Sequence, residues 1–336
     1  MSPRSKTLAQ AGFSAIELMI AVTIGVLISG VVATVFITSA TTYRVSNSVA
    51  ELQETGRVAV AAMERDGRMA GFRGCNSNNV LNTGPFVNTI STPTAYNNAL
   101  DAYVRGYNWM GAGWSPVLDD VPFNIVNGSD VLMLRVPSGP AASVTAVMPN
   151  ASAAIQLNTT AGLSVGDRII VADCAQSSGF RITNVAGNMV SHASGALNAT
   201  DDLQRAFGDD ATVVPYTARQ YYLGTSSSGI AGETSLWVKD GTNAPQELAE
   251  NVERFELLFG EDLNADYVAD IFRSANTVAN FRNVVAVQVH MLTRGTRPNE
   301  TMTDTSYKFL GATTTPTDRR IRRVYVATIQ LRNRVL

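Results

Sequence analysis

The sequence is poor in charge. Only 16% of its 336 residues are charged, and 26 Lys+Arg against 28 Asp+Glu leave a net charge of −2. This balance gives no argument for nucleic-acid binding or for an acidic substrate. Ser, Thr, Asn and Gly are abundant instead, which suits an extracytoplasmic β-rich protein better than a cytosolic helical one.

Catalytic signatures are also missing. The only histidines are His192 and His290, and the sequence contains no G-x-S-x-G, HExxH, P-loop or dinucleotide fingerprint. Neither cysteine has a CxxC partner that would mark a redox site. We therefore expect that the protein is not an enzyme.

One long uncharged run lies near the N-terminus. Residues 18–37 carry no charge, and this run is long enough to cross a hydrocarbon core of about 30 Å. Residues 1–12 carry two basic residues, Arg4 and Lys6, and no acid, which predicts a cytoplasmic N-terminus and export of the rest of the chain. A cleaved signal peptide would have a shorter apolar core. A plain anchor has the right length but leaves Glu17 unexplained, because an isolated carboxylate in hydrocarbon is costly.

The stretch "GFSAIELMIA" at 12–21 resembles the N-terminal motif of type IV prepilins and pseudopilins, G-F-[ST]-x-x-E-L, with no departure. In that family a membrane peptidase cuts after the Gly and methylates the new N-terminus. The resemblance implies a leader at 1–12, cleavage and N-methylation at Gly12 and Phe13, and an assembly charge at Glu17. A paired charge is tolerated in an apolar bundle, so Glu17 would meet the new amine of its own chain or of a neighbour.

The apolar helix continues past the membrane segment. Apolar and small residues recur at spacings of three and four, with charged residues between them. This apolar stripe consists of Val45, Val49, Leu52, Gly56, Val60, Met63, Gly67 and Ala70. This predicts one continuous helix over 14–70, about 80 Å long, with a transmembrane or filament-core part at 13–43 and an amphipathic part at 44–74. Gly71 and Gly74 supply stop signals. We expect the second part to pack its apolar stripe on its own globular domain.

From Cys75 onward the pattern changes to strands and polar loops, so residues 75–336 form the predicted globular, periplasmic domain. Several segments alternate apolar and polar residues, as half-buried antiparallel strands do. The predicted fold is α+β and type IV pilin-like, with one long N-terminal helix packed on a large antiparallel β domain. The predicted strands are 130–136, 168–174, 180–185, 219–224, 235–240, 252–260, 284–294 and 322–334.

Both ends of the chain resemble the PilW family of minor pilins. The matching segments are "ELQETGRVAVAAMERDGRMAGFRGC", "VERFELLFGEDLNADYVADIF", "VVAVQVHMLTR" and "RRIRRVYVATIQLRNR". The resemblance implies a minor pilin that helps to initiate type IV pilus assembly and sits in the tip complex, supporting a PilY-type adhesin in twitching motility and cell adhesion. Two alternatives remain: a J-type pseudopilin of a type II secretion system, and a pilus-borne module that binds DNA or a surface.

The same resemblance implies partners and a location. The partners would be the prepilin peptidase, other minor pilins, the major pilin and a PilY-type tip adhesin, with no nucleic acid expected. The chain would be a single-pass inner-membrane protein with a periplasmic domain, and would later move to the extracellular pilus tip.

The two cysteines, Cys75 and Cys174, are an even, minimal count in an exported chain, which favours one disulfide. A loop of this length would stabilise the fold by about 4–5 kcal/mol in the chain-entropy model. The alternative is two separate buried thiols.

No cofactor is expected apart from a possible calcium ion. Asp262, Asn264, Asp266 and Asp270 in "DLNADYVAD" resemble the start of a calcium loop. Two departures count against it: the sixth position is Tyr267 rather than Gly, and the twelfth is Arg273 rather than Glu. The alternative is a polar hairpin turn that uses Asp and Asn for backbone hydrogen bonds.

Two further clusters have competing interpretations. The arginines at 319, 320, 322 and 323 could bind nucleic acid or an acidic partner, but a solvated strand edge that is protected by charge is the favoured interpretation. Tyr107, Trp109 and Trp114 lie in a Gly-rich segment that we predict to be a loop. They could anchor a partner, although such residues more often pin a loop to the core.

Overall fold

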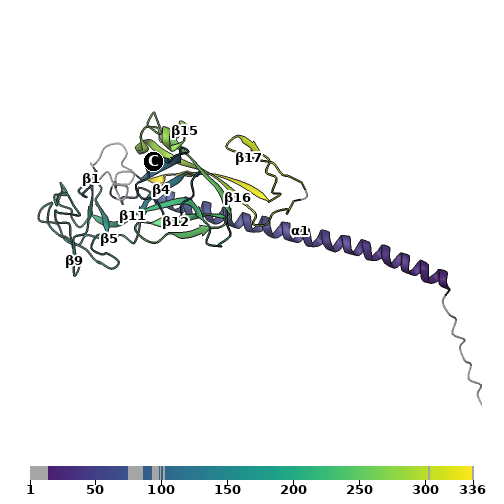
Figure 1. Ribbon diagram of the computed structural model, residues 1–336. Helices are drawn as coiled ribbons and strands as arrows, with labels where there is room; N and C mark the ends of the chain where they lie inside the picture. Colours follow the sequence, from purple (N-terminus) through teal and green to yellow (C-terminus); the bar gives the residue numbers. More distant parts are fainter. Residues whose placement is uncertain are drawn as a thin grey trace, which may run out of the picture.

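The computed structural model describes residues 14–74, 86–92, 98, 100, 103–301 and 303–334, without the side chain of the last residue. The predicted leader, the cleavage site Gly12–Phe13 and Cys75 lie outside the described residues. A single long helix projects from a β-rich domain (Figure 1). The predicted α+β class is therefore confirmed.

The helix α1 (Ala15–Met69) has 55 residues and is about 80 Å long, within one residue of the prediction at each end. Ser14 is the N-cap of the helix. Beyond its C-terminal end, Gly71 adopts a left-handed conformation with φ of +75°. Within its most apolar 18-residue window, none of the helix is buried, and length and composition would let it cross a membrane. The second half enters the β domain (Figure 1).

The strands of the described residues are short in the middle of the chain and long toward its end. They are β1 (Phe86–Asn88), β2 (Val104–Trp109), β3 (Trp114–Ser115), β4 (Val131–Pro137), β5 (Ala142–Ser143), β6 (Ile155–Gln156), β7 (Arg168–Ala172), β8 (Ser177–Arg181), β9 (Asn184–Ala186), β10 (Met189–Ser191), β11 (Thr212–Thr225), β12 (Thr234–Asp240), β13 (Gln246–Ala249), β14 (Val252–Glu261), β15 (Ile271–Arg273), β16 (Val284–Arg294), β17 (Tyr307–Phe309), β18 (Ala312–Thr314) and β19 (Arg322–Gln330). Three 3-10 helices, η1 (Ala275–Thr277), η2 (Phe281–Asn283) and η3 (Arg332–Arg334), complete the described elements.

Two sheets position the helix. In the ten-stranded sheet, β11 pairs with β4, β5, β7 and β12; the four-stranded sheet has the order β15-β14-β16-β19. The pairings are antiparallel as predicted, except that β1 and β8 run parallel. One core, which includes Met63, Tyr221, Phe255 and Ile329, joins the helix to both sheets. A separate core lies under β5 to β10 (Figure 1, left), far from the free end of the helix.

The strand predictions hold best where the apolar pattern is long. The predicted strand 284–294 is β16 to the residue, and 252–260 is β14 but for one residue. The loop prediction around "VRGYNW" is wrong, because this segment forms β2, which pairs with β3 and β4. Gly106 lies inside β2 because the Phe259 ring occupies the place of its missing side chain. The segments 137–164 and 186–200, in which no strand is predicted, also contain short strands, β5, β6 and β10.

Candidate functional site: the junction between helix and sheet

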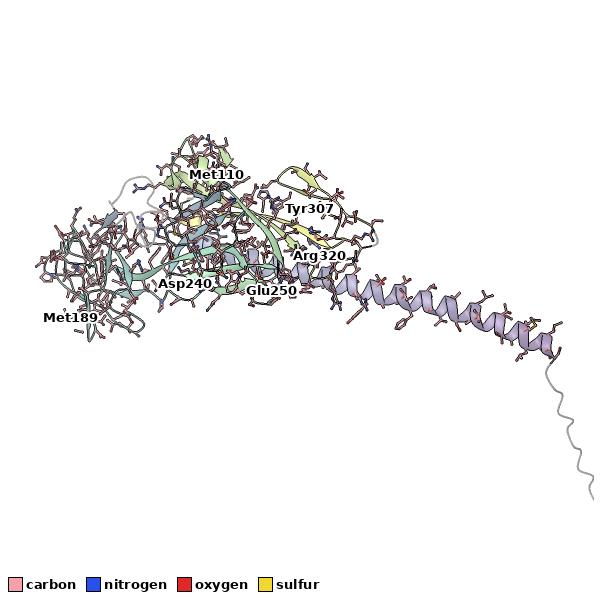
Figure 2. All side chains as sticks on the ribbon, in the orientation of Figure 1. Met110, Met189, Asp240, Glu250, Tyr307 and Arg320 are labelled. Atoms are coloured by element: carbon pink, nitrogen blue, oxygen red, sulfur yellow. The ribbon has the colours of Figure 1, made fainter. Side chains whose placement is uncertain are left out.

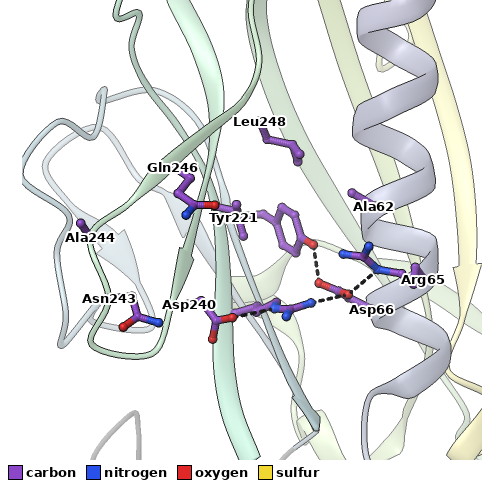
Figure 3. Close-up of a pocket in the computed structure, with 11 residues that line it drawn as sticks. Ala62, Arg65, Asp66, Tyr221, Asp240, Asn243, Ala244, Gln246 and Leu248 are labelled. Carbon is purple, nitrogen blue, oxygen red and sulfur yellow. Dashed lines mark hydrogen bonds and ion pairs between the residues drawn. The ribbon is translucent and has the colours of Figure 1, made fainter. Parts of the chain in front are cut away.

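Asp66 is the chemical centre of the junction between α1 and the ten-stranded sheet. Only 3% of it is exposed. Its carboxylate accepts hydrogen bonds from the Tyr221 hydroxyl (2.5 Å) and from Arg219 Nη1 (2.8 Å), both on β11. Arg65 Nε lies 3.3 Å away on the same helix (Figure 3). A residue of the helix is thus held by two residues more than 150 positions further along the chain.

The charges of this cluster are balanced. Arg219 also pairs with Asp240 of β12 (3.1 Å), which accepts a hydrogen bond from Thr217. Burial opposes the charged form of Arg219, but the hydrogen bond and charge of Asp66 outweigh it and raise its pKa. Burial and the Asp66 charge raise the pKa of the Tyr221 hydroxyl, so it stays a donor. A buried carboxylate is tolerable only when it is paired and hydrogen-bonded in this way.

A cavity of about 270 Å³ opens beside this cluster, and Asp66, Arg219, Asp240, Asn243 and Gln246 are among the residues that line it (Figure 3). Both carboxylates in it are already paired with Arg219. The ion pairs of Arg219 therefore connect the helix to the sheet, and we infer that the cluster holds these two elements in a fixed arrangement.

Two glycines let the four-stranded sheet approach the helix closely. A Cβ on Gly56 would lie 2.3 Å from Tyr325 Cζ, and one on Gly67 would lie 2.3 Å from Ile329 Cγ2. The Tyr325 hydroxyl donates to the Leu52 carbonyl (2.8 Å), which fixes the ring over Gly56. These contacts explain why the helix contains glycine at positions where propensity alone disfavours it.

The segment η3 caps the C-terminal end of α1. Asn333 of η3 donates its amide to the carbonyls of Arg68 (3.1 Å) and Ala70 (3.0 Å). Helix C-termini leave carbonyls without partners, and here the C-terminal segment satisfies two of them.

A second buried acid holds the two sheets together. Asp130 precedes β4 and accepts hydrogen bonds from Asn108 Nδ2 (2.7 Å), from Trp109 N and from Leu257 N (2.9 Å), so it links β2 to β14. Burial raises its pKa, although these hydrogen bonds oppose the rise. Burial and the neighbouring Asp130 raise the pKa of Glu256 to about 7. We therefore expect that the stability of the contact between the two sheets depends on pH near neutrality.

At the other end of the molecule, Glu17 takes part in a capping box. Its carboxylate accepts a hydrogen bond from the backbone N–H of Ser14 (3.0 Å), while the Ser14 hydroxyl accepts from backbone N–H groups of the first turn. The pattern Ser-x-x-Glu before an apolar run signals this cap, and the sequence reasoning missed it. The assembly role of Glu17 stays a prediction, because Phe13 lies outside the described residues.

In the acidic loop at 262–270, carboxylate oxygens accept hydrogen bonds from backbone N–H groups of the same loop. Asp262 accepts hydrogen bonds from the backbone N–H groups of Ala265 (2.7 Å) and Tyr267 (2.9 Å), and Asp270 accepts from Leu263 (2.7 Å). Among the described residues, no group of three His, Cys, Asp or Glu side chains could hold a metal ion. The geometry is that of the polar turn that the sequence leaves as the alternative; calcium binding stays an untested prediction.

Cys174 lies in the turn after β7, and its predicted pairing with Cys75 concerns a residue outside the described part of the chain. The neighbouring backbone favours the pairing. A Cβ on Gly74 would lie 2.9 Å from Thr212 Oγ1, and Thr212 is the ladder partner of Ala172. The residue before one cysteine therefore lies beside the strand that leads into the other.

The predicted solvated arginine edge is wrong for two of its members. The side chain of Arg322 is only 6% exposed and pairs with Glu253 (2.6 Å) and Asp318 (2.7 Å). Arg320, which is labelled in Figure 2, pairs with Glu233 (3.6 Å). These cations fix the segment before β19 to the domain, because three acids far apart in the sequence meet them there. They are therefore poorly placed to serve nucleic-acid phosphates.

The aromatic segment is pinned to the core. Tyr107 is fully buried, and the rings of Trp109 and Trp114 pack edge to face at 4.7 Å across the β2–β3 hairpin. The Trp114 indole N–H donates to the carbonyl of Ser129 (3.0 Å). All three rings are thus engaged in contacts within the domain.

The fold and the junction define a class of protein: an exposed apolar helix, long enough to cross a membrane, that is rigidly fixed to a β domain. Comparison with known families shows a match to one part of the chain. Residues 220–333 match the model of the PilW family, described as Type IV Pilus-assembly protein W. The match covers 114 of the 336 residues, and this part of the chain is similar to a family that is described by its role in type IV pilus assembly.

No curated protein and no solved structure matches the chain. The family match begins next to Arg219 and ends at Asn333, so it contains Tyr221, Tyr325 and Ile329. The matched segment therefore supplies several of the strands that contact the helix, while β4 and Arg219 lie outside it.

Proposed function

We propose that the chain is a minor pilin that helps to initiate type IV pilus assembly and forms part of the tip complex, where it supports a PilY-type adhesin. One observation carries the proposal. The sheet built by the PilW-matching residues fixes the second half of α1, while the first half stays exposed and apolar. Such a helix is suited to a lipid bilayer first and to a bundle of similar helices afterwards.

The N-terminal motif supports the same proposal. Cleavage after Gly12 would leave Phe13 as an N-methylated terminus, one residue before the Ser14 cap. The capping box engages one oxygen of Glu17, and the other is available to an amine. We propose that Glu17 provides the anion that meets an N-terminal amine during assembly. Unchanged assembly by a Glu17→Ala variant would contradict this role, and Ser14→Ala is the matched control for the loss of the cap alone.

The proposed topology follows from the distribution of charge. The basic leader would stay in the cytoplasm, and the β domain would lie in the periplasm. An oxidising compartment would allow Cys75 and Cys174 to form their disulfide. Mass mapping under non-reducing conditions tests the pairing; two separate alkylated thiols in the exported protein would contradict it.

The test of the proposed function is co-purification of the full chain with candidate minor pilins in mild detergent. We expect a stable complex with minor pilins, which a PilY-type adhesin joins. A complex only with secretion-system subunits would point to a J-type pseudopilin instead. Absence of any stable complex would contradict the role in initiation.

A further inference from the structure

A groove lies where α1 leaves the β domain, on the side of the membrane-spanning half. The segment 295–301 packs against the helix here, and Ser48 Oγ donates a hydrogen bond to Glu300 Oε1 (2.6 Å). Between helix and segment there is a cavity of about 500 Å³, and its lining includes Tyr43, Arg44, Asn47, Thr296 and Arg297. The proposed assembly function does not use this groove.

The position of the groove along the helix places it at the membrane surface. The apolar run ends at Ile37, and Arg44 lies seven residues further along the helix, about 10 Å away. The headgroup layer adds about 5–8 Å to each side of the hydrocarbon core. Side chains on a helix tilt toward its N-terminus, which here is toward the membrane. The guanidinium of Arg44 can therefore reach phosphate level, and the exposed Tyr43 lies at the interface that aromatic residues favour.

Within the described part of the chain, the basic side chains of the groove have no acidic partner. Arg44 and Arg297 are both exposed, and neither has an ion-pair partner among the described residues. By contrast, the nearby Arg294, Arg320 and Arg322 all pair with acids.

The acids near the groove are engaged in hydrogen bonds. Glu51 lines the groove seven residues further from the membrane, again about 10 Å, and accepts a hydrogen bond from Asn251 (3.0 Å). Glu300 is engaged by Ser48. The groove thus contains two exposed guanidinium groups without an ion-pair partner among the described residues, whereas the carboxylates of Glu51 and Glu300 are already engaged.

We propose that this groove binds the phosphate of an anionic phospholipid in the outer leaflet while the chain is held in the membrane. The inference rests on the proposed membrane location. Guanidinium groups match phosphate oxygens with paired hydrogen bonds, and the amide of Asn47 and the hydroxyl of Thr296 add neutral donors. The bound lipid holds segment 295–301 at the membrane surface and so sets the orientation of the β domain before assembly.

The test uses the full chain in lipid vesicles that contain spin-labelled phosphatidylglycerol or phosphatidylcholine, with no other pilus subunit present. The ratio of the two association constants reports selectivity for the anionic lipid. We expect a clear preference for phosphatidylglycerol, which Arg44→Gln or Arg297→Gln each lowers by up to about fivefold, since one arginine near an anionic surface contributes this much. Arg323→Gln is the matched control, because Arg323 is an exposed arginine on β19, away from the groove.

Three results would overturn the proposal. They are an unchanged lipid ratio in both groove variants, an equal loss in Arg323→Gln, or a chain that does not enter the bilayer. Thermal unfolding of each variant shows that the fold is intact. Failure of the chain to associate with other pilins would overturn the proposed assembly function but would leave this lipid ratio unaffected, so the two failures are distinguishable.

Discussion

The Asp66–Tyr221 contact lends itself to a double-mutant cycle. Both residues are at least 97% buried, and they join the helix to β11 through a 2.5 Å hydrogen bond. Asp66→Ala removes the acceptor of the Tyr221 hydroxyl and one partner of Arg219. Breaking a buried ion pair in this way costs about 3–5 kcal/mol of the free energy of unfolding. Tyr221→Phe removes one donor from a buried carboxylate and costs about 1.5–3 kcal/mol.

The double variant should lose less than the sum of the two single variants, because each single variant already breaks the same hydrogen bond. We expect a coupling energy of about 1.5–3 kcal/mol. Urea unfolding of the full chain in detergent, followed by tryptophan fluorescence, measures all four proteins. Arg57→Ala is the control: its pair with Glu54 is fully exposed, so removing it changes the free energy of unfolding little. Additive losses in the double variant would contradict the claim that the Asp66–Tyr221 hydrogen bond stabilises the junction between helix and sheet.

Three other predictions concern the packing, the pH response and the disulfide. Gly56→Ala should destabilise the chain by about 1–3 kcal/mol in urea unfolding, because its Cβ would meet the Tyr325 ring. Gly30→Ala, with nothing within 4 Å, should be neutral or stabilising; equal effects would be the contrary result. Since the pKa of Glu256 is raised from 4.5 to about 7, the folded state binds its proton more tightly than the unfolded state does. The free energy of unfolding should therefore fall by about 3 kcal/mol between pH 4.5 and pH 8, and Glu256→Gln should remove most of this fall; an equal fall in the variant would contradict the assignment. Reduction of the predicted Cys75–Cys174 disulfide should lower the free energy of unfolding by about 2–5 kcal/mol, measured with and without reductant; no change would argue for separate thiols.

The helix and the long strands were predictable because their signals are local. A 3.6-residue period over some fifty positions and two glycines at the end locate α1 to within one residue. The long alternating strands β14 and β16 behave in the same way. The short strands in the middle of the chain carry too few residues to show a period.

The junction could not be predicted, because its partners are distant in the sequence. Asp66 belongs by pattern to the charged face of the helix, yet it is buried because Arg219 and Tyr221 meet it there. The predicted apolar stripe includes Val60, whereas the structure buries Ala59 instead and leaves Val60 half-exposed. The sequence shows which helical positions are apolar, but the shape of the sheets decides which of them face the core.

The burial of Arg322 escaped prediction for the same reason. Four arginines close together in a sequence resemble a solvated edge. Only the fold shows that Glu253 and Asp318 stand opposite Arg322. Local patterns therefore predicted the elements, while the ion pairs between distant segments needed the structure.

The most direct test of the central claim is mass spectrometry of pili that have been sheared from cells producing this chain. The proposed function predicts that the pili contain the chain in small amounts relative to the major subunit. It also predicts that the first peptide begins at an N-methylated Phe13. A chain that is found only in the membrane fraction, with residues 1–12 still attached, would contradict the claim.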